Sequence, residues 1–192
     1  MDITSRVKNI LRTPKTEWPL IAGEPASVGS LYNGYIVPLA AIGPIAMLVA
    51  FTARGAFGGG IFFAVMQYVF SLISVYITAL IFSTLAPSFG GRDDLVQGLK
   101  LTAHATTAVW IAAASRILVF IPVIWVLASL LMLVAAIYTI YLFYLGAPFV
   151  LAIPEDRAAV FTLVAVVVVI VVYLVLTYLL GLIIGGGMMM AM

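Results

Sequence analysis

The chain has no cysteine, and only 8% of its 192 residues are charged. The lack of cysteine excludes disulfide bonds, thiolate metal sites and cysteine nucleophiles. The shortage of charge excludes a soluble globular protein, because seven acidic and nine basic residues are too few to cover the surface of a fold of this size. With 65% hydrophobic residues and a mean hydropathy of +1.27, the protein is expected to lie in a membrane.

Charged residues are missing altogether from three long stretches, which cover 37 residues at 55–91, 38 at 117–154 and 35 from 158 to the end. A helix that crosses the hydrocarbon core needs about twenty apolar residues. We therefore predict an all-α membrane protein, a bundle of five transmembrane helices with a short N-terminal amphipathic helix. The expected spans are 34–53, 61–86, 101–121, 123–147 and 158–184. They form a domain at 31–185, between a cytoplasmic amphipathic arm and linker at 1–30 and a flexible tail at 186–192.

Residues 2–12 have the pattern of an amphipathic helix. Ile3, Val7 and Ile10 fall on one helical face, and the basic residues that lie off this face are candidate contacts with a membrane surface: Arg6, Lys8 and Arg12. The alternative is an exposed cytoplasmic arm that only fixes the topology. Three prolines between residues 14 and 25 predict an extended linker after this helix.

The basic residues also predict the orientation in the membrane. Five spans with the N-terminus inside place seven basic residues on the cytoplasmic side and two, Arg54 and Arg116, on the other, where Arg116 would reach back to the headgroups. Four spans, with 101–121 not crossing, give the same count of seven to two. Length favours five, since 101–121 has just enough residues to cross. The small residues of this segment predict a place at the centre of the bundle.

Polar residues recur on one face of the second span, and further polar residues lie in the third. The candidate intramembrane polar face comprises Gln67, Ser71, Ser74, Thr78, His104 and Thr107. One hypothesis is a polar pathway between the two spans. The other is that these groups hydrogen-bond across helices and hold the bundle together, at about 0.6 kcal/mol each. We favour the second, because no acidic residue lies at mid-membrane to bind a coupling ion.

Other patterns give little chemistry. Three tyrosines near the end of the fourth span form either an aromatic belt or a candidate partner face: Tyr138, Tyr141 and Tyr144. GxSxG, HExxH and P-loop motifs are all missing. The net charge of +2 is not gathered into a basic face. We therefore expect no enzyme activity, no cofactor, no metal site and no nucleic-acid partner.

Two segments carry a family resemblance. Residues 141–148 read YLFYLGAP and are followed by IPEDRA at 153–158, while Trp18, Ile21 and Glu24 precede YIVPLA at 35–40. Over roughly residues 14–180 this pattern resembles bacterial Yip1-domain proteins. The resemblance implies five transmembrane helices, a cytoplasmic N-terminus and the bacterial inner membrane. Eukaryotic members act in ER–Golgi trafficking through small GTPases, but their Asp-Leu-Tyr-Gly-Pro motif is missing here.

The expected function is accordingly that of a membrane organiser or accessory subunit, which is not catalytic. Its partners would be the lipid bilayer and either another membrane protein or further copies of the same chain. The alternative is a small-solute transporter or channel that uses the polar faces of the second and third spans.

Overall fold

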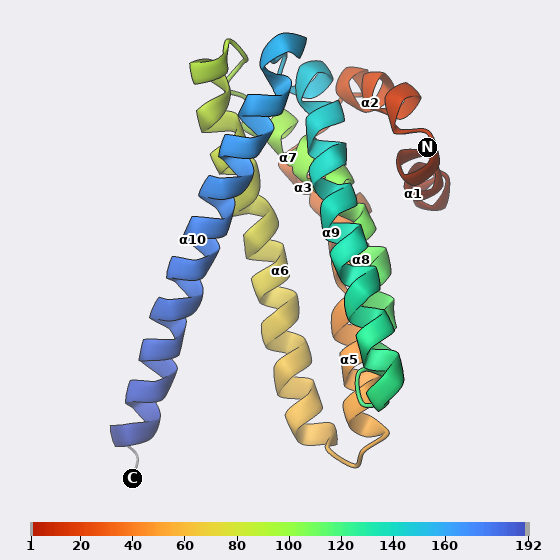
Figure 1. The fold of residues 1–192 in the computed structure, drawn as a ribbon, viewed down its shortest axis with the longest axis vertical. Helices are drawn as coiled ribbons and strands as arrows, with labels where there is room; N and C mark the ends of the chain where they lie inside the picture. Colours follow the sequence, from red (N-terminus) through yellow and green to blue (C-terminus); the bar gives the residue numbers. More distant parts are fainter. Residues whose placement is uncertain (1, 191–192) are drawn as a thin grey trace.

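The computed structural model describes the backbone of residues 2–190, and every regular element in this range is helical (Figure 1). Side chains are described except at residue 122 and, near the C-terminus, at 176–177 and 179–190. The elements are α1 Ile3–Arg12, α2 Pro14–Gly23, α3 Val28–Leu31, the π-helical turn η1 Tyr32–Ile36, α4 Val37–Ala40, α5 Ile42–Thr52, α6 Phe57–Leu85, the 3₁₀ turn η2 Ala86–Phe89, α7 Leu95–Ala105, α8 Thr107–Ala112, the 3₁₀ turn η3 Ala113–Leu118, α9 Pro122–Val150 and α10 Glu155–Met190.

Four helical stretches are long and apolar enough to cross a membrane: Val28–Thr52, Phe57–Phe89, Val123–Val150 and Glu155–Val175. They correspond to four of the five expected spans, at 34–53, 61–86, 123–147 and 158–184. Of the predicted flexible tail at 186–192, residues 191–192 lie outside the described residues, and the tail stays a prediction.

The N-terminal region is two short helices. Asp2 caps α1 by accepting a hydrogen bond from the Thr4 backbone N–H, and α2 begins at Pro14, a position where proline is tolerated because its missing N–H would have no partner. The prediction of an extended linker was therefore wrong for residues 14–23. Burial of apolar side chains stabilises this helix, since Trp18 and Ile21 are fully buried.

The first span is bent at its two prolines. Pro38 and Pro44 lack the N–H that an unbroken α-helix would use. The turn before Pro38 widens to π-helical geometry, in which the Val37 N–H bonds to the carbonyl of Tyr32, and a second irregularity at Ala41 precedes Pro44.

The expected third span is not one continuous helix. It consists of α7, α8 and η3, and the break falls at Thr106, whose hydroxyl donates to the Thr102 carbonyl at 2.7 Å. Threonine hydroxyls compete in this way with regular helical geometry. Residues 98–105 of α7 are all buried, however, as the prediction of a central place required.

Two hydrogen bonds fix how these pieces lie relative to the long helices. The Arg54 side chain, just before α6, donates to the Phe120 carbonyl, just before α9, at 2.8 Å. The Arg92 N–H, just after η2, donates to the Leu151 carbonyl, just after α9, at 2.9 Å. We call the ends that these contacts mark the Arg54 end and the α2 end of the bundle. The chain between Arg92 and Phe120 runs from the α2 end to the Arg54 end.

Helix α10 packs most closely against the bundle near its start. There Phe161 contacts Phe82 and Phe89 with ring centroids 5.5 Å apart in each pair, and Ala165 is fully buried. The contacts of α10 with α6 extend as far as Tyr173, whose ring lies 5.9 Å from that of Phe70. Farther along, Leu174 is 66% exposed and Tyr178 is 68% exposed. Figure 1 shows α10 diverging from α6 toward its C-terminal end.

Candidate functional site

The six predicted intramembrane polar residues do not form one face. Gln67, Ser71, Ser74 and Thr78 of α6 line cavities inside the bundle. His104 and Thr107 instead face the first span and α2, where each contacts Tyr35. The spacing in each helix was sufficient to group residues on that helix, but the rotation of one helix relative to the other depends on packing that the pattern does not contain.

A polar cluster, buried except for Glu24, lies at the α2 end; we define it as Arg6, Glu17, Glu24, Lys100 and His104. The Arg6 guanidinium is 5% exposed and pairs with Glu17, which is 2% exposed, at 2.6 Å, and also with Glu24. The prediction that Arg6 contacts the membrane surface was therefore wrong. Its charge is neutralised inside the protein, because α1 folds back onto α2. Lys8 and Arg12 are exposed on α1 and remain candidates for surface contact.

Lys100 fixes the end of α2. Its ammonium donates to the carbonyl oxygens of Ala22 at 3.1 Å and Glu24 at 2.6 Å, and the residue is 3% exposed. A cation is favourable here because the last carbonyls of a helix have no partner within the helix and carry partial negative charge. Burial lowers the pKa of Lys100, which immediately precedes the predicted third span, while the carboxylates of Asp94 and Glu24 oppose the shift.

His104 is held on all sides. Its Nδ1 donates to the Lys100 carbonyl at 2.7 Å, and its ring lies 4.4 Å from that of Tyr35 and 6.3 Å from that of Trp18, between centroids. The Tyr35 hydroxyl in turn shares a hydrogen bond of 2.7 Å with Thr107. These contacts make His104 and Thr107 a joint between α7, the first span and α2. In the part of the chain that the structure describes, His, Asp and Glu side chains do not gather in threes as metal ligands.

The polar side of α6 faces a cavity of about 490 Å³ that lies between α6, α7, α8, α9 and α10. Thr78 bonds across it to the Tyr173 hydroxyl at 3.1 Å. The hydroxyls of Ser74 on α6 and Thr139 on α9 are buried there without a hydrogen-bond partner. Ser71, Thr102 and Thr106 also line the cavity, and the remaining lining residues are apolar. The cavity therefore offers hydroxyl groups in an apolar wall and no charged side chain.

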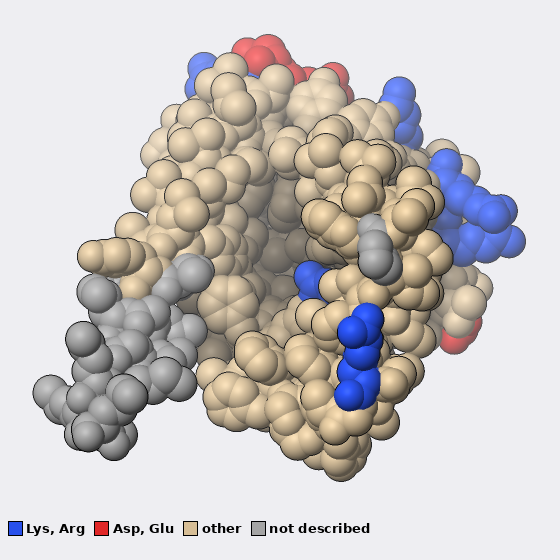
Figure 2. Space-filling model, turned by 60° about the horizontal axis from the view of Figure 1, so that its bottom comes forward, with Lys and Arg blue, Asp and Glu red and all other residues tan. Residues whose placement is uncertain are grey.

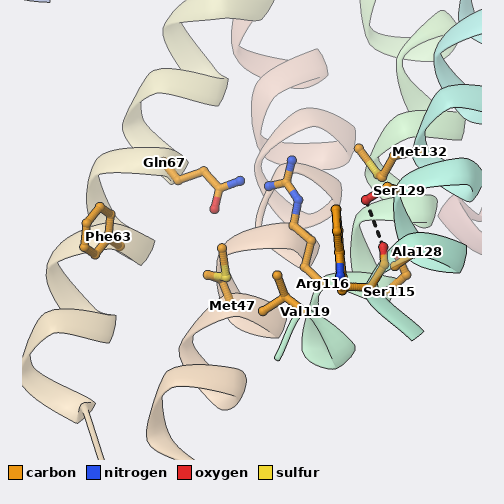
Figure 3. Close-up of a pocket in the computed structure, with 10 residues that line it drawn as sticks. Met47, Phe63, Gln67, Ser115, Arg116, Val119, Ala128, Ser129 and Met132 are labelled. Carbon is orange, nitrogen blue, oxygen red and sulfur yellow. Dashed lines mark hydrogen bonds between the residues drawn. The ribbon is translucent and has the colours of Figure 1, made fainter. Parts of the chain in front are cut away.

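A second cavity, of about 610 Å³, lies nearer the Arg54 end between α5, α6, η3 and α9. Figure 3 shows Arg116 extending from η3 into this space toward Gln67 of α6. A smaller cavity of about 250 Å³, lined by Gln67, Ser71, Ser74 and Arg116 among others, lies between the two larger ones. From the sequence, we expected Arg116 only to reach back to the headgroups. The sequence did contain a signal for a site, because Arg116 is the one basic residue between positions 101 and 156 apart from the single histidine.

The three tyrosines of α9 separate as well. Tyr138 donates to the Leu11 carbonyl at 2.8 Å and so anchors the end of α1, while its ring lies 5.8 Å from that of Tyr141. Tyr141 and Tyr144 are each 40% exposed. Tyr141 and Tyr144 of the candidate partner face are therefore accessible to a partner, whereas the Tyr138 hydroxyl is bonded to α1.

A comparison with protein families matches the Yip1 domain over residues 8–188. Comparisons with curated proteins and with solved structures gave no match. The matched region begins within α1 and extends into the last part of α10, so it includes the α2-end cluster apart from Arg6, both large cavities and all the long apolar helices. The chain is a membrane protein and belongs to the Yip1-domain family.

Proposed function

We propose that this Yip1-domain protein is a non-catalytic organiser or accessory subunit of the bacterial inner membrane. In this proposal the chain crosses the bilayer five times, keeps its N-terminus in the cytoplasm, and binds a membrane-protein partner or further copies of itself. The observation that carries the proposal is the divergence of α10 from the bundle, which leaves long apolar helical faces without a neighbour.

The exposed faces of α9 and α10 support this proposal. Val134 and Ile137 on α9 and Leu163 and Leu174 on α10 are 60–66% exposed. Close packing of side chains drives helix association in lipid, so a helix seated beside α10 would gain contacts with these exposed faces.

The five crossings are supported by connectivity. The chain leaves α6 at the α2 end and enters α9 at the Arg54 end, as the contacts of Arg92 and Arg54 indicate. Residues 95–118 therefore have to travel the height of the bundle, although no single helix of the segment is long enough to cross alone.

The transporter alternative has one favourable observation, the row of cavities along the polar side of α6. The separation of His104 and Thr107 from that row counts against it, because the predicted pathway required all six residues. The double substitution Gln67→Leu and Ser74→Leu distinguishes the two functions. A transporter would stay folded and lose flux, whereas a packing role predicts altered stability or assembly.

The test is site-specific photo-crosslinking in intact membranes, followed by purification in mild detergent. A photoreactive residue at position 174 on α10 is expected to give one defined adduct, either with a second copy or with one membrane protein. The control position is Phe62, which is 62% exposed on α6 at the Arg54 end and should give no defined protein adduct. If position 174 gives no adduct and the protein purifies as a single chain, the proposal fails.

A further inference from the structure

Arg116 is a cation without an acidic neighbour. The seven acidic residues lie at positions 2, 17, 24, 93, 94, 155 and 156: just before α1, in α2, at the residue after α2, in the loop before α7 and at the start of α10. Figure 1 places these segments away from the Arg54 end, to which η3 belongs. A half-buried guanidinium is costly unless an anion pairs with it. No Asp or Glu side chain lies at this end, so an anion from outside the chain would offset this cost.

The cavity around Arg116 is built to receive such a group. A Cβ atom added to Gly43 of α5 would lie 3.3 Å from an Arg116 guanidinium nitrogen and 3.8 Å from the Gln67 amide nitrogen. The two donors therefore lie close together beside Gly43, which itself lines the adjoining smaller cavity. The Ser115 hydroxyl lines the cavity of about 610 Å³ together with Arg116 and Gln67, and it is buried without a hydrogen-bond partner. A guanidinium with neighbouring donors matches the oxygens of a phosphate.

Apart from Ser129, whose hydroxyl donates to the Trp125 carbonyl, the rest of the cavity wall is largely apolar. Met47, Phe63, Val119 and Met132 surround the polar group in Figure 3, and the volume of about 610 Å³ is within the range of small-ligand sites. Figure 2 shows a hollow that opens at this end of the molecule with basic atoms inside it, and Arg116 is the cation among the cavity's lining residues. A free phosphate ion would leave those apolar walls uncovered. A phosphate that carries acyl chains would fill both parts.

We propose that the Arg116 cavity binds a phospholipid from the leaflet at the Arg54 end. Arg116 and Gln67 hold its phosphate, and its acyl chains lie along the apolar wall formed by α5, α6 and α9. This site goes beyond the role of an accessory subunit and does not depend on it, because its walls belong to a single chain.

The test is native mass spectrometry of the full-length protein after exchange into a delipidating detergent, with phosphatidylglycerol added back. The wild type is expected to take up one molecule tightly. Arg116→Gln should weaken this binding at least about tenfold, since a charge-assisted hydrogen-bond pair is lost. Arg116→Lys keeps the positive charge but loses the paired N–H donors of the guanidinium. Its lipid affinity should therefore fall between those of the wild type and Arg116→Gln. Size-exclusion profiles and thermal melting establish that the variants are folded.

The matched control is Arg54→Gln, the same change at the other cation of this end. The Arg54 side chain is already engaged with the Phe120 carbonyl at 2.8 Å and with the Phe120 ring, so lipid affinity should stay within twofold of the wild type. Gln67→Leu is a second test variant, which removes one donor and leaves every charge in place. We expect it to reduce lipid affinity a few-fold. Should Arg116→Gln fail to fold, Arg116→Lys and Gln67→Leu decide the matter.

Three outcomes would overturn the proposal. One is unchanged lipid binding in folded Arg116→Gln, or in both Arg116→Lys and Gln67→Leu. Another is an equal loss in Arg54→Gln, which would indicate a nonspecific effect of charge. The third is displacement of the lipid by millimolar inorganic phosphate, which would make the site one for the free ion.

Discussion

At the scale of single residues, the most consequential feature is the ion pair of Arg6 with Glu17. Both groups are almost fully buried, so their attraction acts in a medium of low polarity, and loss of either would leave a buried charge without its main partner. The pair links α1 to α2, which share few other polar contacts. It explains why a sequence that looks like a free basic arm is folded against the bundle.

Removing one partner of this pair should release α1. Arg6→Gln leaves the Glu17 carboxylate buried without its cation, and such a loss costs about 3–5 kcal/mol. We expect hydrogen exchange of the amides in residues 3–12 to rise to the level of an unfolded segment, while the long helices stay protected. Glu24→Gln is the control, because the Glu24 side chain is 51% exposed and should contribute about 1 kcal/mol or less. Continued protection of α1 in Arg6→Gln would contradict the assignment.

Lys100 acts on a single group of atoms, the last carbonyls of α2. In Lys100→Met, which keeps the length of the side chain, these carbonyls lose a charged donor while they stay partly buried. Hydrogen exchange in residues 19–24 should become roughly tenfold faster or more, given the usual contribution of about 1.5–3 kcal/mol for a hydrogen bond to a charged group. Lys15→Met, at the exposed start of α2, should leave the exchange unchanged. Equal effects of the two substitutions would rule out a capping role.

At the scale of elements, the approach of α7 to α6 depends on Gly98. A Cβ atom there would lie 2.6 Å from the Ala79 carbonyl oxygen, which is backbone and cannot turn aside. The small residues of α7 allow this close contact, and close contact is the principal source of helix association within a bilayer. This contact accounts for the burial of α7, which lacks the length of a spanning helix.

The substitution Gly98→Ala should therefore separate α6 from α7. We expect a loss of about 1–3 kcal/mol, as for other overpacked positions, seen as a lower melting temperature in detergent. Gly59→Ala is a matched control on α6, because no atom lies within 4 Å of the added methyl. It should leave the melting temperature unchanged or raise it slightly, since alanine favours helix more than glycine does. A similar loss in both variants would show that general helix effects, not the contact, are responsible.

At the scale of the whole molecule, the number of membrane crossings decides where every site lies. The absence of cysteine makes a direct test simple, because single cysteines can be placed at Ala56, Asp93, Ile121 and Glu155 without competing thiols. An impermeant thiol reagent applied from outside should label positions 56 and 121. Positions 93 and 155 should react only after the membrane is opened.

The comparison of positions 93 and 121 is the decisive one, because only the segment between them distinguishes five crossings from four. Labelling of both from the same side would contradict five crossings, and with them the placement of the N-terminus and C-terminus on opposite sides. It would also move the Arg116 cavity to the other leaflet.

The sequence by itself determined the solvent of this protein and most of its helices. Long runs without charge can be stable only in lipid, and in lipid each run has to satisfy its own backbone hydrogen bonds as a helix. The sequence also predicted that Gln67, Ser71, Ser74 and Thr78 lie on one side of a helix, because the helical period alone decides which residues of a helix share a face. The resemblance at residues 141–158 was sufficient to indicate the family.

Only the tertiary structure decided which helical faces meet. His104 and Thr107 lie away from the polar side of α6 because α7 is turned toward Tyr35 and Trp18, and Arg6 is buried because α1 folds back onto α2. Arg116 lines a cavity, and its guanidinium lies against Gly43, where a side chain would crowd it. Each of these placements depends on side chains from distant parts of the chain that fit together, and that fit is a property of packing rather than of any local pattern.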